Sequence, residues 1–295
     1  MARVLISTPF LDGALVTLGE HELIRGAPGA DAKAVALICD PTQAVSRATQ
    51  EQMPDLRIIA VAGAGLDAID CEFAKAQGTQ VIAAREALAE TTADLAFGLI
   101  IAASRRMGEA EAALRAKEWT GWQFIDEFGR DVHGATLGLV GFGAIGKAVA
   151  RRAAGFRMEV LHHTRTPTGI DGWIADLDDL LRRSDVISIH VPLSPSTRHL
   201  IDRRRLALCK PTTVFVNTAR GAVVDEGALA DALEAGQIFA AGIDVFAAEP
   251  TVHSRLMTAP RTVLLPHIGS ATLSTRREML RTAAEAVRDS LAAAD

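Results

Sequence analysis

Several features are scarce in this sequence of 295 residues, and each absence narrows the class of protein. The three cysteines, Cys39, Cys71 and Cys209, are far apart and odd in number, so we expect reduced, buried thiols of a cytoplasmic protein. No cluster of cysteine and histidine has metal-ligand spacing. His162 and His163 are adjacent in a predicted strand, so their side chains point to opposite faces and cannot share an ion. No metal is therefore expected.

Long apolar runs and an excess of positive charge are also missing. No apolar run reaches the length that crosses a membrane, and the start, MARVLISTPF, predicts a strand and not a signal peptide. The formal net charge is -5, which gives no reason to expect nucleic acid or an anionic membrane as a partner. There is no internal repeat, low-complexity segment or flexible linker. With 49% hydrophobic and 23% charged residues, the chain is predicted to be soluble and to form two domains.

The stretch from Ala135 to Arg165 carries the clearest motif. An apolar run at 136–140 is followed by apolar residues at helical spacing, and a second β-rich run comes at 158–162. Between the first run and the helix stand three glycines spaced as G-x-G-x-x-G: Gly141, Gly143 and Gly146. Strand, tight turn, helix and strand form the unit that binds a dinucleotide, whereas the glycine pattern alone would be weak evidence.

Each glycine has a distinct expected role. Gly141 permits the turn, Gly143 lets the backbone approach a pyrophosphate, and Gly146 lets the helix lie close to the strand. The N–H groups of residues 144–146 and the helix dipole would then face the phosphates. The alternative is a glycine-rich turn between strand and helix that binds no ligand.

Short apolar runs alternate with room for helices along the rest of the chain. This alternation predicts an α/β fold with two doubly wound parallel-sheet domains, in which ligands lie beyond the carboxyl ends of the strands. The expected boundaries give a discontinuous substrate domain, 1–94 plus 271–295, and a dinucleotide-binding domain, 95–270. The further predicted strands are 3–7, 34–38, 56–61, 80–82, 186–191, 213–217, 240–245 and 262–265, and the predicted helices between or after them are 177–183, 202–209, 226–235 and 274–293. Asp178 or Asp225 could cap two of these helices.

A long apolar helix is predicted over 89–106 and is interpreted as the crossing between the domains. It is expected to be too short and too polar at its ends to cross a membrane, with Thr91 or Thr92 as its N-cap. The following residues, 108–133, are more polar and include two tryptophans. They could form an arm that packs on a second subunit of a homodimer, or a surface excursion that covers its own domain.

Three ionisable residues, Arg220, Glu249 and His267, each follow a predicted strand of the second domain. Hydride transfer between a nicotinamide and a 2-oxo acid needs such a set. A guanidinium can hold the carboxylate and polarise the carbonyl, and a histidine can supply the proton. A carboxylate beside the histidine favours its protonated form and fixes its orientation. Each residue alone would be interpreted as an ordinary surface or turn residue, but together they favour catalysis.

At these residues the sequence resembles the D-isomer-specific 2-hydroxyacid dehydrogenases, and is most similar to glyoxylate and hydroxypyruvate reductases. The resemblance implies a flavodoxin-like substrate domain and an inserted Rossmann domain. It covers most of the chain in the family's order, through the segments AGAGLDAID (62–70), ETTADLAFGL (90–99), LGLVGFGAIGKAVARR (137–152), SDVISIHVPLSPSTRHLI (184–201), VFVNTARGAVVDEGALADALEAGQIFAAGIDVFAAEP (214–250) and LLPHIGSAT (264–272).

The resemblance also implies roles residue by residue. Arg220 matches the substrate-binding arginine, Glu249 the partner of the catalytic histidine, and His267 the acid/base. The backbone N–H groups of Ala64 and Gly65 would hold the substrate carboxylate together with Arg220. The remaining matches to cofactor-contact positions are Thr92, Ala144, Ile145, Thr218, Asp244 and Gly269, of which Asp244 would meet the nicotinamide amide.

The chain departs from the family after the second strand of the motif. Relatives that use NAD have an aspartate near position 164, whereas this sequence has Thr164 and Arg165, which would not repel a 2′-phosphate. We therefore expect NADP(H) to be preferred, with NAD(H) possible. Relatives also continue past the last helix, so the substrate domain is expected to be less braced where this sequence stops.

The predicted protein is thus a cytoplasmic, homodimeric NAD(P)-dependent reductase of a small 2-oxo acid that yields the D-2-hydroxy acid. A phosphoglycerate dehydrogenase is disfavoured, because no regulatory domain follows and no basic cluster for a substrate phosphate is evident. The alternative from another class is a dinucleotide-sensing regulatory protein of the same fold without turnover. The absence of long interaction tails disfavours it.

Overall fold

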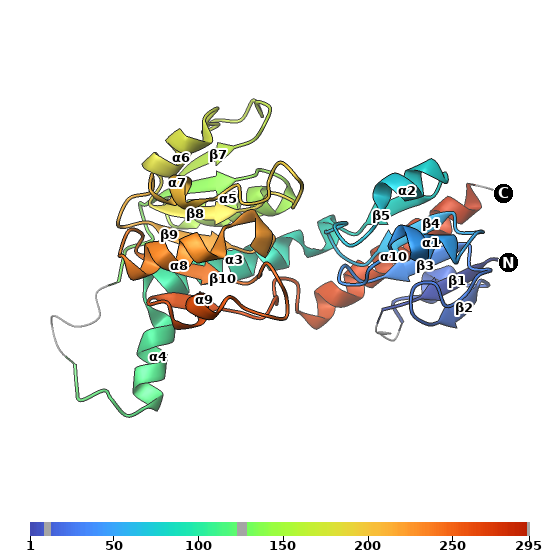
Figure 1. The fold of residues 1–295 in the computed structure, drawn as a ribbon, viewed down its shortest axis with the longest axis horizontal. Coiled ribbons are helices and arrows are strands. Elements are labelled where there is room, and N and C mark those ends of the chain that lie inside the picture. The colour runs from blue at the N-terminus through green and yellow to red at the C-terminus, as the bar shows by residue number, and fades with distance from the viewer. Residues whose placement is uncertain (9–12, 123–128, 294–295) are drawn as a thin grey trace. The chain divides into compact units, whose positions relative to one another are not determined.

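The computed structural model describes residues 1–8, 13–122 and 129–293, and it divides into two compact units (Figure 1). Unit 1 comprises Met1–Thr91 and Ser270–Asp295, and unit 2 comprises Thr92–Gly269. The sequence placed the divisions slightly later, at 94/95 and 270/271. The chain of unit 1 is therefore interrupted by the whole of unit 2.

Unit 1 is built on a five-stranded parallel sheet with the order β2-β1-β3-β4-β5, which is the flavodoxin-like order. Its strands are β1 Arg3–Ile6, β2 Glu22–Arg25, β3 Ala36–Cys39, β4 Ile58–Val61 and β5 Gln80–Ala83. The edge strand β2 was not expected from the sequence. Its side chains are mostly exposed and charged at both ends, so it lacks the apolar run that marks the buried strands β3 and β4.

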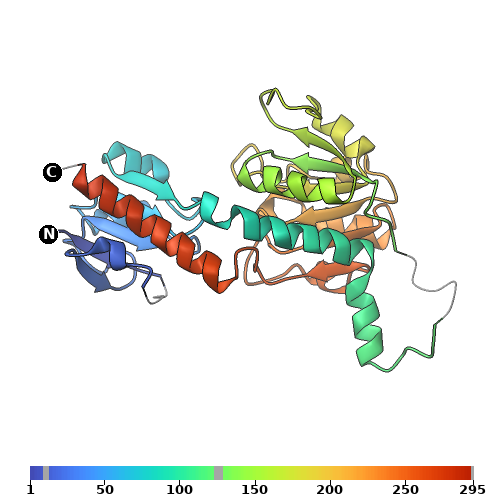
Figure 2. The same cartoon turned by 180° about the vertical axis from the view of Figure 1, so that it is seen from behind.

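Helices cover both faces of this sheet. One face is covered by the segments that contain α1 Arg47–Glu51 and α2 Cys71–Ala76, from which Met53, Leu56 and Ala74 join strand residues such as Leu37 and Ile59 in one buried cluster. The closing helix α10, Leu273–Ala292, lies against β3, β4 and β5 (Figure 2). The buried residues of α10 form one mainly apolar stripe along it. Two short 3-10 turns, Val16–Leu18 and Glu86–Leu88, complete the unit.

Unit 2 contains a six-stranded parallel sheet with the order β11-β10-β9-β8-β6-β7. Its strands are β6 Thr136–Val140, β7 Glu159–His163, β8 Val186–Ile189, β9 Val214–Asn217, β10 Ala240–Ile243 and β11 Thr262–Leu264. From β6 the chain goes first to β7 on one side and then to β8 on the other. The strand order therefore reverses at β6, and ligands of open α/β sheets bind beside such a reversal.

Helices also cover both faces of the unit 2 sheet. One face carries α3, Ala89–Ser104, and α5, Ala144–Gly155, whose buried side chains pack with those of β6 and β9. The opposite face carries α6 Leu177–Arg183, α7 Arg203–Leu206, α8 Glu226–Glu234 and α9 Ser254–Thr258 (Figures 1 and 2). A short 3-10 turn follows β9 at Gly221–Val223. Fully buried strands such as β8 and β9 are typical of a sheet covered on both sides.

Some expected helix caps are wrong. Asp225 caps α8 as expected, because its carboxylate accepts a hydrogen bond from Ala228 N at 3.0 Å. At α6 the cap is Asp176 and not Asp178, which lies in the first turn. Thr91 and Thr92 lie inside α3, because that helix continues directly from the preceding 3-10 turn.

The apolar helix, together with the preceding 3-10 turn, both begins and ends earlier than the expected range of 89–106. Residues Glu86–Ser104 form 19 helical residues that would be long and apolar enough to cross a membrane, so the expectation that they are too short is wrong. Within unit 2, Ala96, Leu99 and Ile100 of this helix are fully or nearly fully buried in the core. Packing on the sheet accounts for the apolar composition.

The arm that follows α3 contrasts with the packed helices. Its helix α4, Met107–Arg115, protrudes from the rest of unit 2 and has no buried residue (Figure 1). Large apolar side chains are exposed on the described part of the arm, namely Met107, Leu114, Trp119 and Trp122. The expected segment 108–133 includes 123–128, which lie outside the described residues.

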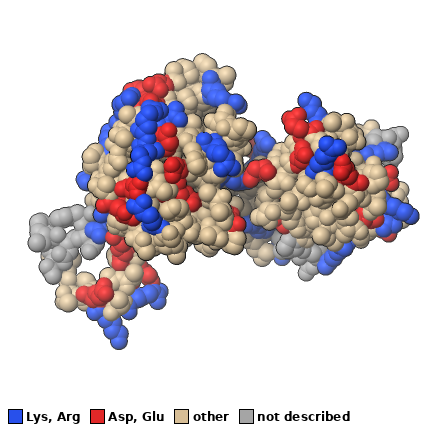
Figure 3. Space-filling model, in the orientation of Figure 1, with Lys and Arg blue, Asp and Glu red and all other residues tan. Residues whose placement is uncertain are grey.

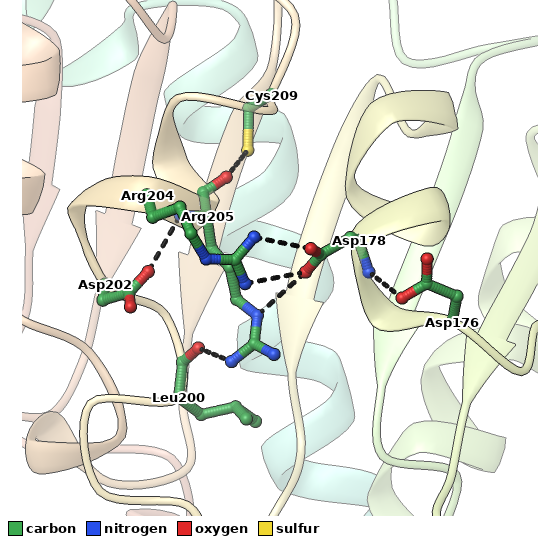
Figure 4. A network of polar contacts seen from close by, with 7 residues as sticks. All are labelled: Asp176, Asp178, Leu200, Asp202, Arg204, Arg205 and Cys209. Carbon is green, nitrogen blue, oxygen red and sulfur yellow. Dashed lines mark hydrogen bonds and ion pairs between the residues drawn. The ribbon is translucent and has the colours of Figure 1, made fainter.

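Charged side chains of both signs are interspersed over the face that carries α7 and α8 (Figure 3). Asp178 of α6 accepts hydrogen bonds from Arg204 at 2.6 and 3.2 Å and from Arg205 at 3.1 Å (Figure 4). These bonds lower the pKa of the Asp178 carboxyl from 3.8 to about 2, with Arg204 as the main cause. The network ties α6 to α7.

The three cysteines are free thiols, two of them buried. Burial, reinforced by the neighbouring charge of Asp40, raises the pKa of Cys39 to about 12. Burial alone raises the pKa of Cys209 to about 12. Both thiols are therefore protonated at neutral pH and behave as small apolar side chains, as expected from the sequence.

Candidate active site

The glycine loop between β6 and α5 has the geometry that its spacing predicts. Gly141 has a φ of +100°, and a Cβ atom there would lie 2.5 Å from the carbonyl oxygen of His190. A Cβ at Gly146 would lie 2.5 Å from the Gly141 carbonyl oxygen, so the helix can start this close to the strand only at a glycine. Around Gly143 the space is open, with no atom within 4 Å of an added Cβ.

Helix α5 begins at this open space. Gly143 is its N-cap, and Ala144 and Ile145 are its first residues. The first N–H groups of a helix have no carbonyl partner within the helix, and they carry the positive end of its dipole. The loop can therefore accept a pyrophosphate, as the sequence predicts.

Arg220 lies in the turn that follows β9, and a buried asparagine holds this turn. Asn217 is 1% exposed, its Nδ2 donates to Arg220 O at 3.0 Å, and its Oδ1 accepts from Ala219 N at 3.0 Å. Arg220 itself donates from Nη1 to Ala219 O at 2.7 Å. The side-chain amide thus fixes the backbone that carries the guanidinium.

The turn with Arg220 packs tightly against the loop that carries Glu249. A Cβ atom at Gly221 would overlap the backbone of Phe246 and Ala247, so only glycine allows this approach. Glu249 is oriented in the same loop, because its Oε1 accepts from Phe246 N at 2.9 Å. The backbone segments that carry Arg220 and Glu249 are therefore in direct contact.

His267 follows β11 and is paired with Glu249. The distance from His267 Nδ1 to Glu249 Oε2 is 2.8 Å, and the two side chains are 37% and 33% exposed. An ionised carboxylate only accepts, so Nδ1 carries the proton and Nε2 is left as the atom that exchanges a proton with a ligand. His267 has a φ of +54°, and its N–H donates to Asp244 O at 2.8 Å. This hydrogen bond to Asp244 holds His267 in an uncommon backbone conformation.

Asp244, just beyond β10, organises the loop around His267. It is fully buried, and its two carboxylate oxygens accept from Ile268 N and Gly269 N at 2.8 Å each. Burial raises the pKa of the Asp244 carboxyl, and the two backbone N–H groups oppose that rise. The family resemblance assigns this residue to the nicotinamide amide, and the structure adds a second role in holding the histidine loop.

The other expected cofactor positions of unit 2 lie close to Asp244 or to β9. A Cβ at Gly269 would lie 3.2 Å from Asp244 Oδ2 and 3.4 Å from Thr92 Cγ2, so these three residues are neighbours. Thr218 is 7% exposed, and its buried hydroxyl has no hydrogen-bond partner among the described residues. An unsatisfied buried hydroxyl is costly unless a ligand completes it. The residues present therefore fit a bound dinucleotide.

The residues expected to choose between cofactors lie at the end of β7, the outer strand next to the glycine loop. Thr164 is partly buried and Arg165 is exposed. Thr164 Oγ1 donates to Thr166 O at 2.7 Å and accepts from Trp173 Nε1 at 3.1 Å. The hydroxyl proton is already used, so Thr164 is neutral towards a 2′-phosphate but is not an available donor.

Ala64 and Gly65 belong to unit 1, in the turn after β4. Neither N–H group donates to an acceptor within the described ranges. A Cβ at the preceding Gly63 would lie 2.7 Å from Pro41, so the turn is closely packed on one side. The predicted role of Ala64 and Gly65 in carboxylate binding stays a prediction.

Metal ligands are not gathered in the described part of the chain. Over residues 1–8, 13–122 and 129–293, no three or more His, Cys, Asp or Glu side chains could hold an ion together. His162 is fully buried and stacks on Phe142 with ring centroids 3.9 Å apart. Burial lowers its pKa, so this imidazole is a neutral packing residue under the glycine loop.

Two residues of the site were missed in the sequence. Asn217 stands three residues before Arg220 at the end of a buried strand, and a polar residue ending an apolar run was the available signal. Trp173 lies in a segment without any motif, so no local pattern pointed to it. Both act on backbone or side chains whose proximity depends on the tertiary fold.

Comparison with known proteins identifies the family. Residues 97–269 match the model for "D-isomer specific 2-hydroxyacid dehydrogenase, NAD binding domain". A glyoxylate reductase of Thermococcus litoralis is 43% identical over 253 residues, which cover 83% of this chain and 76% of that protein. A D-3-phosphoglycerate dehydrogenase of Mycobacterium leprae is 38% identical over 98% of this chain but only 57% of its own length.

Solved structures agree with this result. A glyoxylate reductase from Paecilomyes thermophila has a TM-score of 0.88 and 34% identity, covering 98% of this chain and 95% of that chain. An NADPH-dependent glyoxylate/hydroxypyruvate reductase from Sinorhizobium meliloti, in complex with NADP and malonate, has a TM-score of 0.87 and 30% identity, covering 98% and 93%. The resemblance found in the sequence is confirmed, and the chain belongs to the D-isomer-specific 2-hydroxyacid dehydrogenases.

Proposed function

We propose that this protein reduces a small 2-oxo acid of the glyoxylate or hydroxypyruvate type to the D-2-hydroxy acid, with NADPH as the preferred reductant and NADH as a possible one. The observation that carries the proposal is the His267–Glu249 pair at 2.8 Å, packed beside the turn that bears Arg220. The three residues follow β9, β10 and β11, and the glycine loop follows β6 of the same parallel sheet, so all of them lie at its carboxyl edge. Relatives named glyoxylate reductase support the substrate class.

The chain's own residues divide the work of the reaction. A nicotinamide, when bound, supplies the hydride. Arg220 binds the carboxylate of the oxo acid and polarises its carbonyl, because its planar fork can donate to two oxygens. His267 delivers a proton from Nε2 to the developing alkoxide oxygen, and Glu249 orients the imidazole by accepting the hydrogen bond from Nδ1.

The cofactor is held by the glycine loop, the start of α5 and the residues around Asp244. Gly141, Gly143 and Gly146 leave the phosphates room, and the Thr218 hydroxyl offers an unused hydrogen-bonding group. The preference for NADPH is supported by the absence of a carboxylate at Thr164 and by the cation at Arg165. A structural neighbour is named as NADPH-dependent, which agrees with this choice.

The direct test is absorbance at 340 nm with NADPH and either glyoxylate or hydroxypyruvate. Turnover is expected with at least one of them, and phenylpyruvate and 2-ketogluconate widen the panel. Tight NADPH binding without turnover on any of the four acids would instead support the dinucleotide-sensing alternative. None of the relatives described above is named as a regulator.

The cofactor preference has its own test. Thr164→Asp combined with Arg165→Ala should shift kcat/KM towards NADH, chiefly by raising KM for NADPH. The new carboxylate repels the 2′-phosphate and accepts the ribose hydroxyls. A wild type that already prefers NADH would contradict the preference while leaving the reductase assignment in place.

The protein is further proposed to be a cytoplasmic homodimer that binds neither nucleic acid, membrane nor metal. The dimer proposal is supported by the arm, whose helix α4 has no buried residue and whose Trp119 is 64% exposed. Exposed apolar groups gathered on one segment favour association with another surface. Light scattering of the wild type and Trp119→Glu tests it: a dimer that becomes monomeric is the expected result, and a monomeric wild type contradicts it.

A further inference from the structure

Residues 172–174, which belong to none of the sequence motifs, lie next to the residues proposed to select the cofactor. Strand β7 is the outer strand of its sheet, and residues 172–174 run along its free edge. His162 N donates to Gly172 O and Ile174 N donates to His162 O, both at 2.8 Å, so Trp173 lies directly beside His162. We call residues 172–174 the edge segment.

The position of the edge segment is fixed by close contacts. Gly172 has a φ of +85°, and a Cβ atom there would overlap the carbonyl oxygen of Val160. His163 Nδ1 is 3.0 Å from Ile174 O, which adds a side-chain contact on the other side of Trp173. The backbone that carries the indole is therefore fixed on both sides of Trp173.

The indole Nε1–H, which is the only donor of the Trp173 side chain, points to Thr164. Its Nε1 lies 3.1 Å from Thr164 Oγ1 and 3.4 Å from Thr164 O. The Thr164 hydroxyl in turn donates to Thr166 O at 2.7 Å. The indole, the hydroxyl and the carbonyl form a chain of hydrogen bonds that closes the turn 164–166, and the exposed Arg165 stands at the centre of this turn.

We propose that Trp173 is a positioning residue for cofactor selection: through Thr164 it fixes the turn that presents Arg165 to a 2′-phosphate. This inference rests on the proposed binding of the 2′-phosphate at this turn. A guanidinium on a fixed turn loses less conformational freedom on binding than one on a loose turn. NADH has no 2′-phosphate, so a looser turn weakens NADPH binding and leaves NADH binding nearly unchanged.

The experiment compares dissociation constants for NADPH and NADH, measured by calorimetry without substrate. Four proteins are used: wild type, Trp173→Phe, Thr164→Val and the double variant. Trp173→Phe keeps the aromatic packing but removes the donor, and one hydrogen bond of this kind corresponds to about a three- to tenfold loss of NADPH affinity relative to NADH. Thr164→Val should give a similar loss from the other side of the contact. The double variant should be no worse than either single variant.

A matched control makes the same chemical change elsewhere. Thr79→Val removes a buried hydroxyl that donates to Leu56 O at 2.9 Å in unit 1, and it should leave the ratio of NADPH affinity to NADH affinity at the wild-type value. An unchanged ratio in Trp173→Phe, or losses that add up fully in the double variant, would overturn the proposal. Melting temperatures of the four proteins show whether Thr164→Val must replace Trp173→Phe as the reporting variant.

The design separates this inference from the proposed function. Binding is measured without turnover, so an inactive protein would still report on Trp173. Arg165→Ala tests whether the 2′-phosphate binds at this turn. It should lower the ratio of NADPH affinity to NADH affinity, and adding Trp173→Phe to it should have no further effect. If Arg165→Ala lowers the ratio and Trp173→Phe does not, the role of Trp173 fails alone. If neither substitution changes the ratio, 2′-phosphate binding at this turn and the role of Trp173 fail together.

Discussion

The two ends of the ligand-binding edge of unit 2 differ in what holds their side chains. After β9, β10 and β11, two buried polar residues, Asn217 and Asp244, fix the backbone around Arg220 and His267 with hydrogen bonds of 2.8 to 3.0 Å. After β7, Thr164 is held by Trp173 from a loop at the sheet edge, and Arg165 is exposed. The first end is held by buried hydrogen bonds and carries the proposed catalytic groups, whereas the second is exposed and carries the residues proposed to select the cofactor.

This difference separates the expected consequences of substitution. At the catalytic end a changed side chain should alter turnover, because it removes a group that acts on the reacting atoms. At the ribose end a change should alter cofactor affinity with little effect on turnover. The following predictions test that division, beginning with the largest effect.

Removal of the proton donor should have the largest effect. His267→Asn should lower kcat by about 10²–10⁴ and leave the NADPH dissociation constant nearly unchanged, because it removes proton transfer but no phosphate contact. Asparagine tolerates the φ of +54° at this position, so the loop should keep its shape. Steady-state kinetics and calorimetry measure the two quantities. Near-normal turnover would refute His267 as the acid.

Arg220→Lys should come next. It should raise KM for the oxo acid and lower kcat, together by about 10²–10³ in kcat/KM, since a point charge cannot replace two parallel hydrogen bonds. Arg220→Ala should be worse still. Wild-type kinetics in the lysine variant would exclude a bidentate role for Arg220. They would also show that the end with Arg220 and His267 tolerates substitution better than expected.

Glu249→Gln should lower kcat by about tenfold and leave the NADPH dissociation constant nearly unchanged. The amide keeps the shape of the side chain but replaces the charged acceptor of the Nδ1–H by a neutral one, so the imidazole is held less firmly for proton transfer from Nε2. The matched control is Glu226→Gln, because Glu226 accepts from Ala247 N at 2.7 Å near the same loop without pairing with His267. A wild-type kcat in Glu249→Gln would exclude the role of Glu249 in holding the imidazole.

The smallest effect should come from a site outside both ends. Asp178→Asn removes the carboxylate that binds Arg204 and Arg205, and should reduce the free energy of unfolding by about 1 kcal/mol at pH 7, with kcat unchanged. Asp178 has a pKa lowered to about 2, so its charge stabilises the fold above pH 3.8 and this contribution is lost as the pH falls towards 2.

Urea denaturation at pH 7 and pH 3 measures this loss. The difference between wild type and Asp178→Asn should be smaller at pH 3. Asp179→Asn is the control, because Asp179 shares the first turn of α6 but is paired with Arg183 only at 3.5 Å. Equal deficits at both pH values would contradict the assignment of the stabilisation to the charged network.

The sequence predicted the fold where the signal was local. The glycine loop was predicted from its spacing, because the strand before it and the helix after it repeat their apolar residues over short intervals. Edge strand β2 was missed, since a half-exposed strand has no such run. The capping role of Asp176 was missed because Asp178 and Asp179 lie close by and are equally suitable capping residues. Only the observed start of the helix shows which of the three is the cap.

The sequence by itself therefore predicted the family, the parallel strands and the glycine loop, and it singled out Arg220, Glu249 and His267 as the proposed catalytic residues. Only the tertiary structure decided how these groups are held. The Asp244 carboxylate meets the N–H groups of residues 268 and 269, and Trp173 meets Thr164, across strand ends and loop returns that no periodic pattern encodes. Strand order and the close approaches at glycines bring such residues together, because a parallel sheet gathers the ends of distant segments at one edge.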